Sequence, residues 1–152
     1  MKAAVIYYSK SGTTERIAKK IQNRIDADLY FIEPDKRYGG YLSSVISVAG
    51  EKLMQKPAKP KTAAADFSEY DVIFIGFPVW YSTAPQFVQD YIKACKLSGK
   101  RIIPFATAGA NGKDSSCKTV KELLPGCNIT DYFFTSKVKE ADADAWLDGI
   151  SF

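Results

Sequence analysis

Runs of apolar residues that fit buried strands alternate along this chain with amphipathic runs that fit helices. The expected strands cover residues 3–8, 28–33, 71–77, 100–109 and 128–138. The expected helices cover residues 13–25, 41–55, 84–96, 113–124 and 142–150. Strands that are apolar along nearly their whole length are typical of a parallel sheet covered by helices on both faces. The alternation therefore predicts a doubly wound α/β fold with a five-stranded parallel sheet, formed by one domain over residues 1–152.

The composition fits a globular domain with a substantial core. The 152 residues are 46% hydrophobic and 25% charged, and no apolar run is long enough to span a bilayer. The N-terminal segment MKAAVIYYSK is too short and too soon interrupted to be a signal peptide, so a cytoplasmic protein with no membrane association is expected. Cys95, Cys117 and Cys127 show no C-x-x-C spacing and are expected to be reduced thiols. No metal site is indicated.

The absence of histidine limits the chemistry that the chain can perform by itself. Ser-His-Asp hydrolysis and Cys-His nucleophilic catalysis are excluded within a single chain, so any reaction must use other groups or a cofactor. The net charge is +4, but lysines and arginines are scattered among acidic residues. A nucleic-acid partner is therefore not expected.

Three loops are expected where a doubly wound sheet binds its ligands, outside the carboxyl ends of the strands. The first, SKSGTT at residues 9–14, carries four hydroxyl groups, and a glycine lets its backbone approach a ligand closely. The loop opens directly into a helix, whose N-terminus favours anions. These features predict a phosphate site. The alternative is that Ser11 or Thr13 only caps the helix.

The second loop lies within GFPVWYSTAP, residues 76–85, and places Trp80 and Tyr81 where a strand ends. Loops lie at the surface, so adjacent aromatic residues there expose apolar area unless something covers them. The alternative is that these side chains fold back onto the core. The third loop, ATAGANG at residues 106–112, consists of small residues. Together the three loops predict a ligand with one phosphate and one flat ring system.

The stretches SxSGTT, GFPVWYSTAP and PFATAGANG occur in the order found in flavodoxins, and residues 1–150 resemble the flavodoxin-like proteins. The resemblance implies strand order 2-1-3-4-5 and noncovalent binding of flavin mononucleotide (FMN). It implies that the FMN phosphate is held by Ser9, Lys10, Ser11, Gly12, Thr13 and Thr14. It also implies that the isoalloxazine ring is lined by Pro78, Val79, Trp80 and Tyr81, and that its pyrimidine edge meets backbone groups of Thr107, Ala108 and Gly109.

Two of these roles lead to specific expectations about side chains. Trp80 is expected to stack on or flank the isoalloxazine ring. Thr13 and Thr14 are expected to be surface hydroxyl groups at a helix start, so their loss would weaken FMN binding and leave the fold intact. No catalytic residue is assigned.

Several classes of function remain open. The first is an electron-transfer flavodoxin that carries electrons to and from a redox partner protein. The second is an FMN-dependent oxidoreductase that moves hydride from NAD(P)H to a small electron acceptor such as a quinone. The third is a flavin-free interaction module of the same fold. The family resemblance favours the first class.

Three features depart from many flavodoxins. The loop ATAGANGKD offers no aromatic residue to close the second ring face, which favours an enzyme with an open site. Residues 77–83 contain no glycine, and Ser82 stands where relatives often have one, so a peptide flip beside the flavin is more costly. The net charge of +4 contrasts with the strongly acidic surface of electron-carrying flavodoxins and favours anionic partners.

Overall fold

The computed structural model describes residues 1–36, 58–109, 111–136 and 139–152, and the helix expected over residues 41–55 lies outside the described residues. The first four strands are β1 (Ala3–Tyr7), β2 (Asp28–Phe31), β3 (Val72–Pro78) and β4 (Arg101–Thr107). Two short strands follow, β5 (Asn128–Ile129) and β6 (Phe133–Thr135). The described helices are α1 (Thr13–Ile25), α3 (Gln86–Ala94), α4 (Lys113–Leu123) and α5 (Glu140–Asp148).

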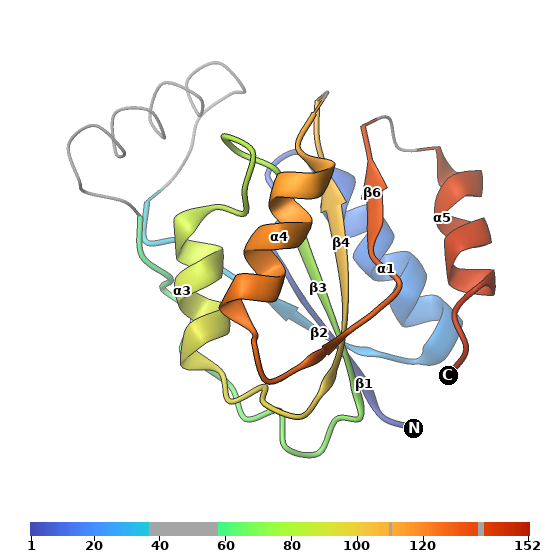
Figure 1. Ribbon diagram of the computed structural model, residues 1–152, viewed down its shortest axis with the longest axis horizontal. Helices are drawn as coiled ribbons and strands as arrows, with labels where there is room; N and C mark the ends of the chain where they lie inside the picture. Colours follow the sequence, from blue (N-terminus) through green and yellow to red (C-terminus); the bar gives the residue numbers. More distant parts are fainter. Residues whose placement is uncertain (37–57, 110, 137–138) are drawn as a thin grey trace.

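All described strand pairs are parallel, and the sheet runs in the order β2-β1-β3-β4, with both β5 and β6 beside β4 (Figure 1). The predicted α/β fold and the order 2-1-3-4-5 are confirmed, with the fifth strand in two pieces. None of the helices in the described ranges has the length and apolar character that crossing a bilayer requires.

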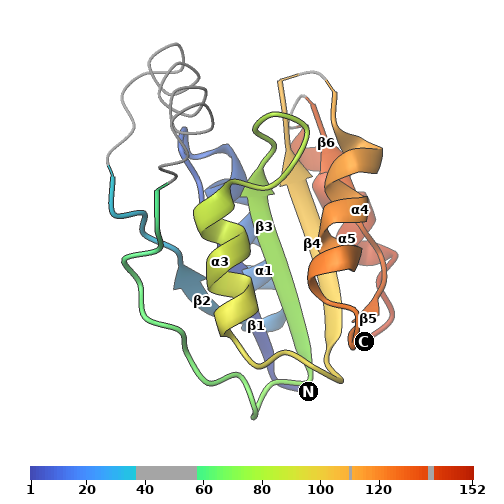
Figure 2. The same cartoon turned by 60° about the vertical axis from the view of Figure 1, so that its left-hand side comes forward.

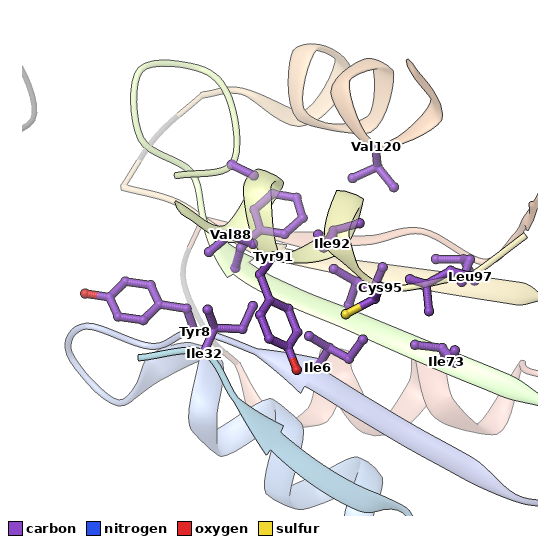
Figure 3. Close-up of a cluster of buried hydrophobic side chains, with 14 of the residues drawn as sticks. Ile6, Tyr8, Ile32, Ile73, Val88, Tyr91, Ile92, Cys95, Leu97 and Val120 are labelled. Carbon is purple, nitrogen blue, oxygen red and sulfur yellow. The ribbon is translucent and has the colours of Figure 1, made fainter. Parts of the chain in front are cut away.

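Helices cover both faces of the sheet, as Figure 2 shows for α3 and α4 in front and α1 and α5 behind. Successive strand residues point to opposite faces, so each strand contributes to two hydrophobic clusters. Ile6, Ile73 and Ile75 pack with residues of α3 and α4, and part of this cluster is drawn in Figure 3. Val5 and Phe74 pack with residues of α1 and α5 on the other face. Burial on both faces explains why the strands are apolar throughout.

The fifth strand is interrupted opposite a proline of β4. The carbonyl oxygen of Ile102 faces this neighbour, because it accepts the N–H of Thr130 at 3.0 Å. Backbone groups alternate sides along a strand, so Pro104 faces the same neighbour and has no N–H to offer it. The register of the pairing with β4 shifts by one residue between β5 and β6. A continuous strand over residues 128–138 was therefore wrong in detail.

The link between β5 and β6 turns at Asp131, whose φ of 53° lies in the left-handed region. Its carboxylate accepts a hydrogen bond from the Arg101 guanidinium at 2.8 Å, and its carbonyl accepts one from the indole N–H of Trp146 at 2.6 Å. The Trp146 ring stacks on Phe133, with ring centroids 4.7 Å apart. These contacts hold the turn against β4 and α5.

Candidate functional site

The loops after β1, β3 and β4 open at the same edge of the sheet, the upper edge in Figures 1 and 2. This is the carboxyl edge, where the parallel strands end and where doubly wound folds bind ligands. The predicted site residues of all three loops are therefore brought to one edge. No group of three or more Cys, Asp or Glu side chains suited to a metal ion occurs within the described residues.

The first loop forms a cradle in front of α1. Gly12 is the N-cap residue and has a φ of 88°, a left-handed conformation that favours glycine. Its N–H donates to the Ser9 hydroxyl at 3.1 Å, and the hydroxyl groups of Ser11 and Thr13 lie 3.2 Å apart near the helix start. A glycine at the N-cap has no side chain with which to accept a hydrogen bond from the first turn, and α1 has no side-chain cap.

This arrangement fits a phosphate group. The backbone N–H groups of Thr13, Thr14 and Glu15 have no hydrogen-bond partner within the described part of the chain. They point out of the helix start, where the helix dipole favours an anion. The hydroxyl groups of the exposed Ser11 and the half-buried Thr13 can donate to the same anion. The alternative interpretation, in which Ser11 or Thr13 caps the helix, is wrong because the cap is Gly12 and no side chain caps it.

Thr14 does not have the surface position expected from its sequence. Its side chain is 1% exposed, and its hydroxyl lies 2.9 Å from the hydroxyl of Thr107, which is 5% exposed. Either hydroxyl can donate. The expectation of a surface hydroxyl was therefore wrong for Thr14, because the first turn of α1 packs its inward face against the end of β4. Thr13 remains half-buried at the cradle.

The second loop makes a tight turn at Tyr81 and Ser82. The N–H of Trp80 donates to the carbonyl of Thr83 at 2.8 Å, and the N–H of Thr83 donates back at 3.2 Å. Tyr81 and Ser82 between them have φ values of 50° and 65°. Two consecutive left-handed residues without glycine are strained, and such strain persists where the surrounding structure imposes it.

The two aromatic residues of this turn have different surroundings. Trp80 is half-buried and contacts Tyr8 and Phe87 edge to face, with ring centroids 5.7 and 6.4 Å apart. Tyr81 is 46% exposed. Trp80 therefore packs partly on the core, as the alternative interpretation of this loop expected, whereas Tyr81 is the aromatic side chain that the turn presents to solvent.

Tyr8 is a member of this edge that the sequence did not single out. It follows β1, is 4% exposed and packs edge to face on Phe87 with centroids 4.7 Å apart. Figure 3 shows its hydroxyl pointing away from the other labelled side chains of the cluster. Burial raises the pKa of Tyr8 to about 12. Its spacing from Ile6 could have indicated that Tyr8 is buried on the same face of the sheet, since residues two apart on a strand share a face.

The third loop already uses some of the backbone groups expected to face a flavin. The carbonyl of Thr107 accepts the N–H of Val79 at 2.7 Å, and the N–H of Ala108 donates to the carbonyl of Thr135 at 3.0 Å. Gly109 is exposed, and its backbone groups make no hydrogen bond with the described residues. Within the described part of the chain, the carbonyl of Ala108 and both backbone groups of Gly109 make no hydrogen bond, so they can meet a ligand.

Pro78, Val79 and Lys10 complete the predicted set. Pro78 ends β3 opposite Thr107, and both it and Val79 are half-buried at the carboxyl edge. Lys10 is half-buried in the phosphate cradle, and the exposed Arg16 follows one turn into α1. Both side chains carry a positive charge within or close to the sequence of the cradle.

Comparison with known proteins agrees with this fold. The sequence matches the family model described as flavodoxin over residues 2–150. A candidate flavoprotein from Bacteroides eggerthii DSM 20697 is 29% identical, with a TM-score of 0.78 over 97% of this chain and 96% of that chain. A candidate flavoprotein from Bacteroides uniformis ATCC 8492 is 26% identical, with a TM-score of 0.81 over 97% of each chain.

A flavoprotein from Lactobacillus acidophilus NCFM, solved in complex with FMN, shares the fold at 20% identity. Its TM-score is 0.73, and the match covers 96% of this chain and 98% of that chain. No curated protein gives a significant match. The family match extends over nearly the whole chain, and the sheet order and the loops at its carboxyl edge agree with it. The chain belongs to the flavodoxin family.

Proposed function

We propose that this protein binds FMN noncovalently as a single domain over residues 1–152 and uses it to carry electrons. The observation that carries the proposal is the uncapped N-terminus of α1 behind Gly12, next to the hydroxyl groups of Ser11 and Thr13. An exposed aromatic turn lies at the same edge of the sheet. Family membership and the FMN complex of the Lactobacillus acidophilus protein support the same cofactor.

Each loop has a role in this proposal. The cradle of Ser9, Lys10, Ser11, Gly12, Thr13 and Thr14 holds the phosphate, mainly through backbone N–H groups of α1 and the hydroxyl groups of Ser11 and Thr13. Pro78, Val79, Trp80 and Tyr81 line the ring, with Tyr81 the most accessible. Ala108 and Gly109 offer backbone groups to the pyrimidine edge, and Thr107 directly precedes them at the end of β4.

FMN supplies one-electron and two-electron redox chemistry when it is bound. The chain contributes binding and orientation, since it has no histidine and no metal-binding cluster in its described residues. The half-buried Val79 and Trp80 exclude water from the side of the site that faces the core. The partner is a redox protein or a small electron acceptor, and the net charge of +4 favours one that is anionic.

An FMN-dependent NAD(P)H:quinone-type oxidoreductase is a second candidate because of the turn at Tyr81 and Ser82. Two hydrogen bonds between Trp80 and Thr83 close this turn, and it contains no glycine. A turn that resists a peptide flip gives little extra stability to a one-electron state, which brings the two one-electron potentials together. Such a site transfers electrons in pairs, from NAD(P)H to a quinone.

A titration with FMN and riboflavin tests the cofactor assignment. The purified protein should quench flavin fluorescence and bind FMN much more tightly than riboflavin, because each hydrogen bond to the phosphate is worth about 1.5–3 kcal/mol. Replacing Ser11 and Thr13 together by alanine should reduce this preference. Ser68→Ala, at an exposed serine that precedes the first residue of β3, is the control and should leave it unchanged. Equal affinity of the unmodified protein for the two flavins contradicts the assignment.

Reduction of the FMN complex separates the carrier from the oxidoreductase. Well separated one-electron potentials without NAD(P)H oxidation indicate a carrier that works with a redox partner protein. Potentials that lie close together, with quinone-dependent NAD(P)H oxidation, indicate the oxidoreductase. Failure to bind any flavin favours an interaction module that keeps the fold.

A further inference from the structure

The geometry points to Thr14 and Thr107 as a pair of positioning residues that set the phosphate cradle relative to the ring-binding loops. This inference rests on the proposed FMN site and deepens it. In it, the Thr14 hydroxyl orients the cradle through Thr107, and the hydroxyl contacts with the phosphate come from Ser11 and Thr13. Neither Thr14 nor Thr107 is given a catalytic role.

Thr14 and Thr107 contact each other through their side chains. The two hydroxyl groups lie 2.9 Å apart and come from positions 93 residues apart in the sequence. Both side chains are buried, with exposed fractions of 1% for Thr14 and 5% for Thr107. Water has little access to these buried positions. Removal of one hydroxyl group therefore leaves the other buried hydroxyl without a hydrogen-bond partner. The bond therefore joins the first turn of α1 to the carboxyl end of β4.

Thr107 also holds the aromatic loop. Its carbonyl accepts the N–H of Val79 at 2.7 Å, directly before the turn that carries Trp80 and Tyr81. The next residue, Ala108, is fixed to the carbonyl of Thr135 in β6 at 3.0 Å. Thr107 thus contacts the cradle through its side chain and the aromatic loop through its backbone.

The cradle has other hydroxyl groups that can contact a ligand. Those of Ser11 and Thr13 lie 3.2 Å apart at an exposed position, whereas the Thr14 hydroxyl faces into the protein. The N–H of Thr14 remains without a partner in the described residues, so Thr14 can offer its backbone to the phosphate while its side chain fixes the backbone in place. If only apolar contacts mattered at this position, valine would pack there as well as threonine does.

A positioning role of the Thr14 hydroxyl and a direct contact of that hydroxyl with the phosphate predict different effects of substitutions. If the Thr14 hydroxyl binds the phosphate by itself, only substitutions of Thr14 lower the preference for FMN over riboflavin. If it acts through Thr107, loss of either hydroxyl has the same effect, and loss of both adds nothing further. A purely structural role lowers the stability of the apo-protein and leaves the preference unchanged.

The experiment measures dissociation constants of FMN and riboflavin for the full chain and its variants. We expect Thr14→Val and Thr107→Val each to reduce the preference for FMN by about threefold to tenfold, the range of one net hydrogen bond. The double variant should show the same loss as either single variant. Thr14→Ser and Thr107→Ser keep a hydroxyl and should retain the preference.

A second pair of threonines provides the matched control. The hydroxyl of Thr83 donates to that of Thr119 at the same distance, 2.9 Å, and this bond does not involve the cradle. Thr119→Val should therefore leave the ratio of the two affinities unchanged. If the valine variants fail to fold, Thr14→Ala and Thr107→Ala remove the hydroxyl groups without adding a methyl group, and the same result is expected.

The outcomes separate this inference from the proposed function. The unmodified protein decides the function, since equal affinity for FMN and riboflavin removes the phosphate site and the positioning pair with it. A preference that survives in Thr107→Val but falls in Thr14→Val overturns the pair and keeps the FMN site. Additive losses in the double variant, or an equal loss in Thr119→Val, also overturn it.

Discussion

Val79 lies directly against the backbone of Gly112, so that a Cβ atom at Gly112 would stand 2.7 Å from the Cγ1 atom of Val79. Gly112 begins α4 with a φ of 118°, a conformation that side chains disfavour. The same Cβ would lie 3.6 Å from the Cα atom of Ser82. The loops after β3 and β4 therefore fit together at a position where only glycine is accommodated without movement.

Gly112→Ala should destabilise the protein and weaken flavin binding together. The added methyl group meets a branched side chain at a strained backbone position, with an expected cost of about 1–3 kcal/mol in the free energy of unfolding. Denaturant unfolding of the apo-protein and an FMN titration measure the two effects. Gly149→Ala is the control, because Gly149 has a φ of −81° and a Cβ there comes no closer than 3.5 Å to its neighbours. Equal stability of the two variants would falsify this account of Gly112.

Ser82→Gly should stabilise the apo-protein by about 0.5–1 kcal/mol. The left-handed conformation of Ser82 costs about 1–2 kcal/mol, and the greater freedom of glycine in the unfolded chain offsets part of the gain. Ser68→Gly is the matched control, since Ser68 is also exposed but does not have a positive φ, and it should lower stability. The midpoints of urea unfolding measure both. A loss of stability in Ser82→Gly contradicts the strained turn.

Substitutions of the two neighbouring aromatic residues should separate stability from binding. Trp80→Ala removes a half-buried ring from its contacts with Tyr8 and Phe87, so the unfolding free energy should fall by about 1–3 kcal/mol and FMN binding should weaken. Tyr81→Asn removes an exposed ring at a left-handed position that asparagine tolerates, so stability should change by less than about 0.5 kcal/mol. Thermal unfolding measures the stability of the two variants, and flavin fluorescence measures their affinity for FMN. Unchanged FMN affinity in both variants would place the ring elsewhere.

The turn between β5 and β6 should make stability fall in acid. Hydrogen bonds from the Thr130 and Arg101 side chains lower the pKa of Asp131 in the folded protein. A group whose pKa is lower in the folded state adds stability above its unfolded pKa, about 3.9, and loses it as pH falls through the folded value. Asp131→Asn should therefore lower the free energy of unfolding at neutral pH. At pH 2–3 the free energies of unfolding of the variant and the unmodified protein should lie closer together.

Asp26 offers a control for the loss of the ion pair. It is exposed, has a φ of 54° like Asp131, and makes no ion pair with the described residues. The urea midpoint of Asp26→Asn at pH 7 should therefore lie close to that of the unmodified protein. A parallel loss of stability in Asp131→Asn and the unmodified protein from pH 7 to pH 3 would exclude the ion pair with Arg101 as the cause.

Local patterns of apolar residues were sufficient to predict the helices and strands that carry such a pattern. The spacing of Ile17, Ala18 and Ile21 predicted α1 within its observed bounds, because a helix repeats its buried face every three to four residues. The apolar run ending at Phe77 predicted β3, whose two faces are both buried. The meeting of the three loops at the carboxyl edge also followed from the sequence, since strand and loop order determine it in a parallel sheet.

The composition of SKSGTT and GFPVWYSTAP by itself determined that one loop would carry hydroxyl groups beside a helix start, as a phosphate site requires, and that another would carry aromatic rings. Only the tertiary structure decided that Thr14 turns inward to Thr107, that Trp80 rests on Tyr8 and Phe87, and that Pro104 divides the fifth strand. These features depend on residues far apart in the chain. A local pattern states which groups a segment contains, but the packing of other segments against it decides which of those groups are buried and which remain available to a ligand.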